Sequence, residues 1–219
     1  MDVTVINVYI AILRYLVPAL IALLLFRSIK PLVSFRKKPH TMKTIQVKDK
    51  EFKIYIPEES IKKRIAETAA AMRLDLADKN PLFIVVLNGA FIFAADLLRE
   101  IDIPCEIIFI RLSSYEGTTS TGKMKNIMGL DKNIEGRTVV IVEDIIDTGL
   151  TMKYLCDTLA KSNPAEIRVA SLFVKPGKLQ TDVKTDYRCF DIDNDFIVGY
   201  GLDYDGEGRN LKEIYKVVD

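Results

Sequence analysis

Residues 139–151 read Val-Val-Ile-Val-Glu-Asp-Ile-Ile-Asp-Thr-Gly-Leu-Thr, an apolar run that leads into three carboxylates and a short turn. Four consecutive β-branched residues favour a strand buried on both faces, as in the middle of a parallel sheet. Thr148 to Thr151 then form a tight turn in which Gly149 can adopt a positive φ, and residues 152–162 are predicted to form a helix. The stretch therefore predicts an α/β fold with a binding site at the carboxyl end of this strand.

The side chains of this stretch indicate a phosphorylated sugar as the ligand. Free backbone amides at the start of a helix carry partial positive charge, so they suit an anion such as phosphate. Carboxylates repel phosphate, so Glu143 and Asp144 are expected to bind neutral hydroxyls, or a hard cation such as Mg²⁺ that the phosphates share. A cis-diol sugar with a phosphate meets both conditions. The alternative is an ordinary buried strand followed by solvated acids and a helix cap.

The same thirteen residues resemble the phosphoribosyl-pyrophosphate signature of the type I phosphoribosyltransferases, in the form used by hypoxanthine-guanine phosphoribosyltransferases. The resemblance runs from about Met42 to the C-terminus. It implies an α/β fold with a central, mainly parallel sheet flanked by helices and a small hood lobe. It also implies a purine-salvage enzyme that transfers 5-phosphoribose from phosphoribosyl pyrophosphate to N9 of a 6-oxopurine, hypoxanthine or guanine, giving IMP or GMP and pyrophosphate.

Two more motifs of the family lie before this signature. The apolar strand 82–87 ends in Asn88-Gly89, where the family binds pyrophosphate with backbone amides, often beside a non-proline cis peptide, so we expect that bond at Leu87-Asn88. Some relatives carry lysine in place of Asn88, so the resemblance carries over the backbone role alone. Ser114 and Tyr115 open a polar segment that resembles the mobile loop that closes over the active site and excludes water.

The motifs after the signature concern the base. Lys175 resembles the lysine that recognises the exocyclic oxygen at position six, because a cationic donor favours an oxo group over an amino group. Residues 196–204 match the motif in which the ring of Phe196 stacks on the purine and the backbone of Ile197 binds its edge. Asp203 corresponds to a carboxylate that helps hold Mg²⁺ through its water shell, and Arg209 to a basic residue near pyrophosphate.

The resemblance also assigns roles within the signature itself. Asp147 is expected to be the general base near purine N7. Glu143 and Asp144 would hold the ribose hydroxyls and, with Asp203, form the metal site for the cofactor Mg²⁺. The 5-phosphate would bind to the turn formed by Thr148, Gly149, Leu150 and Thr151. The expected assembly is a homodimer or homotetramer.

Between the motifs, the apolar pattern is consistent with a single sheet. Residues 52–56 alternate like a half-buried strand, and strands are also expected at 105–112, 126–130 and 167–174. Residues 190–200 are expected to belong to the small lobe. Pro57 introduces a helix with one apolar face, made by Ile61, Ile65, Ala69, Met72 and Leu76. A second amphipathic helix follows residue 90, with its apolar side at Phe91, Ala94, Leu97 and Leu98.

Composition limits the partners and the compartment. The 219 residues include 31 basic and 30 acidic side chains, so there is no broad positive field for a nucleic acid. The three cysteines show no metal-ligand spacing and fit a reducing compartment. The expected location is therefore the cytoplasm, with phosphoribosyl pyrophosphate and a 6-oxopurine as the partners.

Residues 3–26 are apolar over a length that suffices for a membrane-spanning helix of ~20 residues. Arg14 near its centre would cost roughly 2.5–3.5 kcal/mol on insertion scales. The basic residues that follow would keep the enzyme on the cytoplasmic side of the membrane. Two interpretations of residues 1–41 stay open: a signal anchor that tethers the domain 42–219, or a mis-assigned start with synthesis beginning at Met42.

Two other functions also stay open. A phosphoribosyltransferase for another base is disfavoured by Lys175 and by the Phe196-Ile197 pair, which both match the oxopurine pattern. A regulatory nucleotide-sensing protein on the same fold is disfavoured by the presence of Asp147, which sensing alone does not require.

Overall fold

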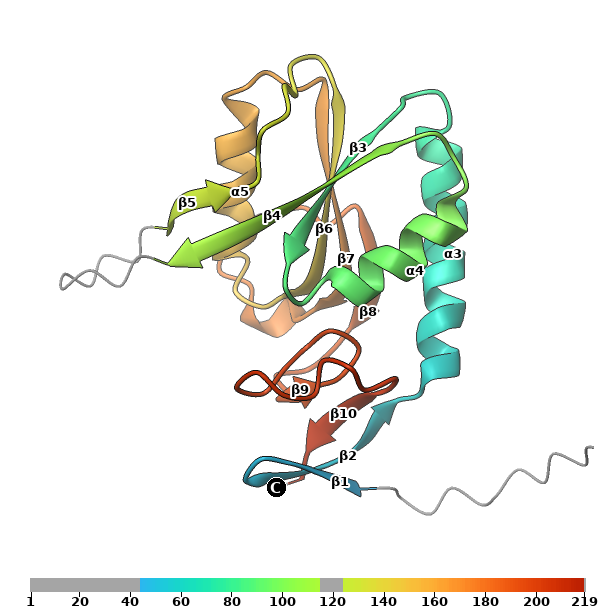
Figure 1. Ribbon diagram of the computed structural model, residues 1–219, viewed down its shortest axis with the longest axis vertical. Coiled ribbons are helices and arrows are strands. Elements are labelled where there is room, and N and C mark those ends of the chain that lie inside the picture. The colour runs from blue at the N-terminus through green and yellow to red at the C-terminus, as the bar shows by residue number, and fades with distance from the viewer. Residues whose placement is uncertain (1–43, 115–123, 219) are drawn as a thin grey trace, which may run out of the picture. The chain divides into compact units, whose positions relative to one another are not determined.

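The fold is described from a computed structural model of the chain, which describes residues 44–114 and 124–218 (Figure 1). The expectations for residues 1–41, for Tyr115 and for the polar segment that follows it lie outside these described residues. Within the described ranges, no helix has the length and apolarity that a membrane span requires.

A six-stranded sheet forms the centre of the domain, with the strand order β5-β4-β3-β6-β7-β8. β5 pairs antiparallel with β4, and all other neighbours are parallel, which confirms the expected mainly parallel sheet. The strands are β3 (Leu82–Leu87), β4 (Glu106–Ser114), β5 (Met124–Met128), β6 (Thr138–Ile146), β7 (Glu166–Val174) and β8 (Tyr187–Asp191). β6 continues beyond its apolar run through Glu143 and Asp144, because this part still pairs with β7.

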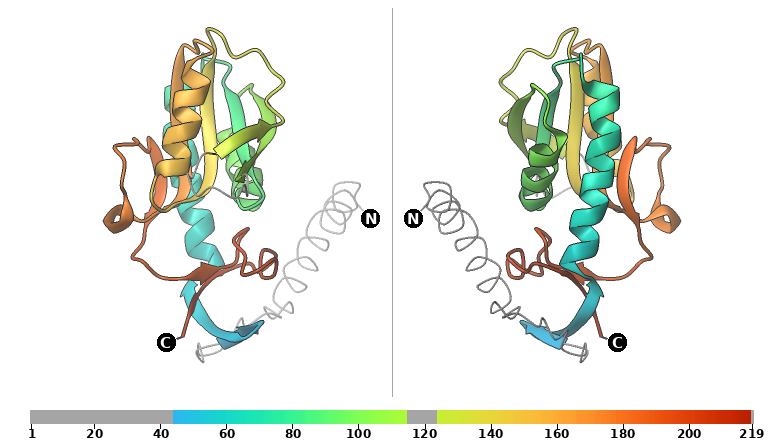
Figure 2. Two further views of the ribbon diagram at one scale, coloured as in Figure 1. Left: turned by 90° about the vertical axis from the view of Figure 1, so that its left-hand side faces the viewer. Right: turned by 90° about the vertical axis from the view of Figure 1, so that its right-hand side faces the viewer.

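Three helices cover the two faces of this sheet (Figure 2). On one face lie α3 (Glu58–Leu76) and α4 (Phe91–Ile101), and on the other lies α5 (Leu150–Ala160). Side chains along β3 alternate between the two cores: Phe83 and Val85 belong to the core with α3 and α4, and Ile84 to the core with α5. The central strands are therefore buried on both sides, which explains their unbroken apolar sequences.

The helices form where the sequence pattern predicts them, but the buried face of α4 and the first residue of α5 differ from the prediction. All five residues predicted for the inner face of α3 are buried. In α4 the expected face is partly wrong, because Phe91 is exposed and Leu98 only half-buried, while Phe93 and Ile101 are buried. The start of this helix is apolar all round, so the pattern did not select one side. α5 begins at Leu150, two residues earlier than predicted.

A smaller antiparallel sheet forms the hood lobe, with the order β1-β2-β10-β9. Its strands are β1 (Thr44–Val47), β2 (Lys50–Ile56), β9 (Ile197–Val198) and β10 (Ile214–Val217), and its core contains Phe52, Val198 and Tyr215. The carboxyl end of β3 points toward this lobe (Figure 1). Assigning all of residues 190–200 to the lobe was wrong, because Phe190 lies in β8 and pairs with β7 in the central sheet.

Candidate active site

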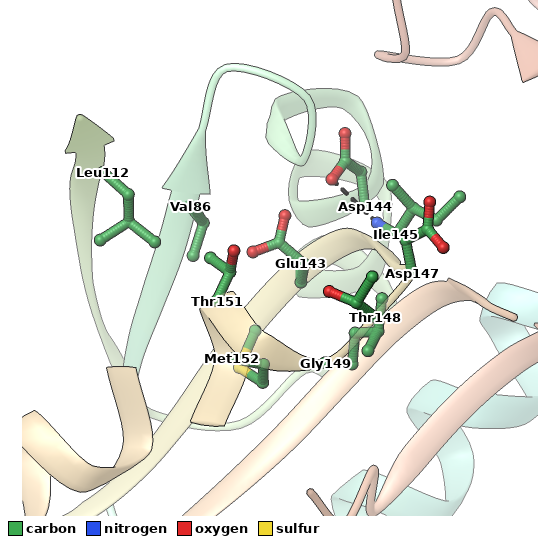
Figure 3. A pocket seen from close by; sticks show the side chains of 11 residues that line it. Val86, Leu112, Glu143, Asp144, Ile145, Asp147, Thr148, Gly149, Thr151 and Met152 are labelled. Carbon is green, nitrogen blue, oxygen red and sulfur yellow. Dashed lines mark hydrogen bonds between the residues drawn. The ribbon is translucent and has the colours of Figure 1, made fainter. Parts of the chain in front are cut away.

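A cavity of about 310 Å³ opens where β6 ends and α5 begins (Figure 3). This volume lies in the range of small-molecule sites. Carboxylates and the turn 148–151 form its polar part, and its lining also includes apolar side chains from β3, β4, β6 and α5: Val86, Leu112, Ile145, Ile146 and Met152. The cavity is therefore at the position predicted from residues 139–151.

The turn between β6 and α5 lines this cavity. Gly149 immediately precedes the helix with φ 78°, which confirms the predicted positive φ. A Cβ at this position would overlap Thr181 Oγ1, so the turn requires glycine for space as well as for conformation. No side chain caps the helix beyond a long contact of 3.4 Å from the Leu150 amide to Thr148 Oγ1. Because the first amides of a helix have no partner within it, they can bind an anion.

Glu143 and Asp144 form an acid pair beside this turn. The Glu143 carboxyl group is buried and points into the cavity, and its Oε2 has no hydrogen-bond partner among the described residues (Figure 3). Burial, and then the nearby charge of Asp144, raise the pKa of Glu143 well above its usual range. Asp144 Oδ1 accepts a bond of 2.8 Å from the Ile145 amide. A buried carboxyl group without a partner is costly, so the pair suits a ligand with hydroxyls or a cation.

The turn after β3 packs directly on this acid pair. The Leu87-Asn88 peptide bond is cis, as the family resemblance implies. Gly89 lies so close to Asp144 that a Cβ on Gly89 would overlap the Oδ2 atom. Gly201, in the hood lobe, lies against the Gly89 carbonyl oxygen in the same way. The β3 turn, the acid pair and the hood lobe thus meet at one place.

Asp147 lies immediately before the turn 148–151 and faces two lysines. Its Oδ2 is 3.1 Å from Lys178 Nζ and 3.9 Å from Lys175 Nζ, whereas its Oδ1 is buried without a hydrogen-bond partner in the described chain. Lys175 is itself buried at the end of β7, where the sequence predicts it. Lys178 was not predicted, because a lysine in a Lys-Pro-Gly-Lys turn has the ordinary appearance of a surface residue.

The other predicted base-side residues lie in the hood lobe. Phe196 is 42% exposed although its ring packs near Phe52 and Tyr204, at centroid distances of 6.1 and 5.4 Å. An exposed ring held by two aromatic neighbours is available for stacking on a flat ligand. Ile197 is buried in β9, so its backbone is held in the small sheet.

Asp203 and Arg209 contact each other in the structure. Arg209 Nη2 lies 2.6 Å from Asp203 Oδ1, and Arg209 Nη1 donates to the Gly201 carbonyl oxygen at 2.7 Å. Within residues 44–114 and 124–218, no three acidic, cysteine or histidine side chains are placed together to hold a metal ion. Asp203 therefore does not join Glu143 and Asp144 in one cluster.

The acid pair alone still fits a Mg²⁺ ion that a substrate shares. Mg²⁺ binds to proteins through one or two carboxylates, with water and substrate oxygens as its other ligands. The partnerless Oε2 of Glu143 is a suitable oxygen for such an ion or for a sugar hydroxyl. Ser114 ends β4, its side chain is outside the described part, and Tyr115 follows it there.

Comparisons with known proteins show the family to which this chain is similar. A family model described as the phosphoribosyl transferase domain matches residues 55–205. The hypoxanthine-guanine phosphoribosyltransferase of Streptococcus agalactiae is 48% identical over 160 residues, which cover 73% of this chain and 89% of that protein. The enzyme of that name from Streptococcus thermophilus is 44% identical over the same coverage.

Solved structures show the same likeness. A hypoxanthine-guanine phosphoribosyltransferase from Bacillus anthracis, with HEPES in its active site, matches with a TM-score of 0.69 and 40% identity, over 75% of this chain and 98% of that one. A hypoxanthine phosphoribosyltransferase variant from Trypanosoma cruzi, in a ternary complex with substrates, matches with a TM-score of 0.70 and 38% identity. That match covers 75% of this chain and 94% of the other.

Proposed function

This chain belongs to the phosphoribosyl transferase family, and we propose that it is the purine-salvage enzyme that transfers 5-phosphoribose from phosphoribosyl pyrophosphate to N9 of hypoxanthine or guanine. The observation that carries the proposal is a combination at the carboxyl end of β6. A buried acid pair, a carboxylate facing two lysines and a glycine turn at a helix start lie within one stretch of residues.

Each part of the donor has a complementary part of the site. The 5-phosphate binds to the amides of the turn Thr148, Gly149, Leu150 and Thr151. The ribose hydroxyls bind to Glu143 and Asp144, and the same carboxylates stabilise positive charge that develops on the sugar ring. The backbone of Leu87, Asn88 and Gly89 binds pyrophosphate, with Arg209 nearby and Ser114 and Tyr115 closing the site against water.

Glu143 and Asp144 would hold Mg²⁺, with Asp203 as a further carboxylate acting through water, and the ion would supply positive charge that offsets the charge on departing pyrophosphate. The remaining chemistry belongs to the protein's own side chains. Asp147, whose Oδ2 faces Lys175 and Lys178, takes the proton from purine N7 while N9 attacks the sugar carbon.

The distance between Lys175 and Asp147 supports a 6-oxopurine as the acceptor. In such a base, N7 and the exocyclic oxygen lie on the same edge of the ring. A donor for the oxygen and an acceptor for an N7 proton must therefore be neighbours, and Lys175 Nζ and Asp147 Oδ2 are 3.9 Å apart. Stacking on Phe196 and backbone contacts at Ile197 would complete the recognition of the base.

A steady-state comparison of bases tests this function. Pyrophosphate release is measured with phosphoribosyl pyrophosphate, Mg²⁺ and one of hypoxanthine, guanine, xanthine or adenine. We expect release with hypoxanthine and guanine, and little with adenine, whose amino group offers Lys175 no acceptor. Pyrophosphate release with adenine only would contradict a 6-oxopurine as the acceptor. Nucleotide binding without turnover of any base would favour the alternative of a nucleotide-sensing protein.

The assembly and the location complete the proposal. We expect a homodimer or homotetramer in the cytoplasm, which sedimentation and cell fractionation would test. The proposed domain is 42–219. Intact mass of the natively expressed protein would decide between a signal anchor in residues 1–41, tethered to the cytoplasmic face through residues 3–26, and a start at Met42.

A further inference from the structure

Lys178 contacts the candidate general base, although neither the sequence pattern nor the family motif singles it out. Its Nζ donates to Asp147 Oδ2 at 3.1 Å, which is shorter than the 3.9 Å from Lys175. Lys178 also lines a second cavity, together with Asp191 and Asp193. Its contact with Asp147 calls for a structural reason.

That reason lies in the backbone of the segment that carries Lys178. The Lys175 amide donates to the Ile146 carbonyl oxygen at 3.0 Å, and the Gln180 amide donates to the Thr148 carbonyl oxygen at 2.9 Å. The two acceptors, Ile146 and Thr148, are the residues immediately before and after Asp147 in the chain. Between the two donor residues, the Lys178 amide donates to the Lys175 carbonyl oxygen at 3.0 Å and closes the short 3-10 turn Pro176–Lys178.

Side-chain packing holds the same segment against the phosphate turn. Thr181, Val183 and Leu179 lie so close to Gly149 that a Cβ there would meet all three. The segment 175–183 is thus fixed along residues 146–149 by backbone bonds and by packing. These bonds and this packing hold Lys178 next to Asp147, although the Lys178 side chain is 37% exposed.

The contact makes the two oxygens of Asp147 different. Oδ2 is occupied by a charge-assisted hydrogen bond, and such bonds are stronger than those between neutral groups. Oδ1 is buried and has no partner among the described residues, so the contacts at Oδ2 set the orientation of the carboxylate. When a base is bound and Lys175 turns to its exocyclic oxygen, Lys178 remains as the cation on Oδ2.

We propose that Lys178 is a positioning residue for the proposed phosphoribosyl transfer: by holding Asp147 Oδ2, it fixes the orientation of the carboxylate that takes the purine proton. The proposal rests on the proposed function of the site. Lys178 acts through Asp147 and touches neither the sugar nor the phosphates. Its removal should therefore affect the rate of the chemical step and leave donor binding unchanged.

The test is a double-mutant cycle on the full chain with hypoxanthine and phosphoribosyl pyrophosphate. Lys178→Met keeps the length of the side chain and removes its charge. We expect kcat to fall about tenfold, a small part of the 10²–10⁴ that a general base contributes. KM for phosphoribosyl pyrophosphate should stay within about twofold of wild type, and Lys178→Arg should restore most of kcat. In an Asp147→Asn background, Lys178→Met should change kcat less than about twofold, because the interaction it serves is already absent.

Lys184→Met is the matched control, because Lys184 is an exposed lysine of the same connection that pairs with Asp186, at 2.5 Å. It should leave kcat unchanged. Unchanged kcat in Lys178→Met, or a loss of the same size in the Asp147→Asn background, would overturn the positioning role. A wild-type chain that releases no pyrophosphate with any 6-oxopurine would instead overturn the proposed function, so the two failures are distinguishable.

Discussion

Among single residues, Asp147 carries the most direct prediction. Asp147→Asn keeps the shape of the side chain and removes its basicity, so we expect kcat to fall by about 10²–10⁴. KM for phosphoribosyl pyrophosphate should change less than about threefold, because the acid pair and the turn 148–151 are untouched. Steady-state kinetics at saturating hypoxanthine measure both constants. Turnover equal to wild type would remove Asp147 from the chemistry.

Gly89 is the residue whose lack of a side chain shapes the donor site. In Gly89→Ala, the new Cβ would overlap Asp144 Oδ2, so either the acid pair or the β3 turn must move. We expect KM for phosphoribosyl pyrophosphate to rise about tenfold, and the free energy of unfolding to fall by about 1–3 kcal/mol from overpacking. Gly177→Ala is the control for stability, since a Cβ at Gly177 meets no atom within 4 Å. Equal KM for variant and wild type would show that the contact does not matter for donor binding.

Individual residues of the site could be predicted where they belong to a local sequence motif. The positive φ of Gly149 was predicted correctly from the sequence of the tight turn, and the cis bond at Leu87-Asn88 was predicted correctly from the family resemblance. Lys178 could not be predicted, since its contact with Asp147 depends on backbone bonds between segments about thirty residues apart in the sequence. The pairing of Asp203 with Arg209 was missed, because the family resemblance assigns each of these residues to a ligand and implies no contact between them.

At the scale of the element, α3 offers a matched pair of leucines near its end. Leu76 is fully buried in the core beneath α3 and α4, whereas Leu74 is 85% exposed. Leu76→Ala should lower the free energy of unfolding by about 2–5 kcal/mol, because it removes buried methyl groups and leaves a cavity. Leu74→Ala should change it by less than about 0.5 kcal/mol. Urea unfolding measures both, and similar losses in the two variants would contradict this orientation of the helix.

The elements themselves were predictable to different degrees. The inner strands of the central sheet were predicted correctly, because burial on both faces leaves unbroken apolar runs such as residues 82–87, but the edge strand β8 was missed. The membership of strands in sheets was harder to predict. Phe190 in β8 and Ile197 in β9 lie close in sequence but in different sheets, and β2 pairs with β10 from the other end of the domain. Such pairings depend on contacts that no local pattern records.

Across the whole molecule, the two ends of the central sheet serve different purposes. The ligand site lies at the carboxyl ends of the strands, while an ionic network lies where β6 and β7 begin. Glu166 accepts hydrogen bonds from Lys79 Nζ at 2.7 Å, Arg168 Nε at 2.9 Å and Thr138 Oγ1 at 3.0 Å. Arg168 also reaches Asp75 of α3 and the hydroxyl group of Tyr187 in β8. This network joins a helix and several strands far from the reacting groups.

The network predicts how stability depends on pH. Burial opposes ionisation of Glu166, but the hydrogen bonds from Lys79, Arg168 and Thr138 outweigh it and lower the pKa of Glu166 to about 2. Because this pKa lies below the ordinary value of about 4.3, ionised Glu166 stabilises the fold fully above pH ~5. That contribution is lost as the pH falls toward 2. Glu166→Gln should therefore lower the free energy of unfolding at pH 7.

Lowering the pKa of Glu166 by about two corresponds to about 3 kcal/mol in the free energy of unfolding. Because the Glu166 side chain is 29% exposed and screened by solvent, we expect a loss of about 1–2 kcal/mol. Urea unfolding at pH 7, 5 and 3 measures it, and the difference between wild type and Glu166→Gln should shrink between pH 5 and 3. Glu59→Gln, at an exposed position of α3, is the control. Since the network lies at the opposite end of the strands, kcat should not change, and a large loss of turnover without unfolding would contradict this separation of stability from catalysis.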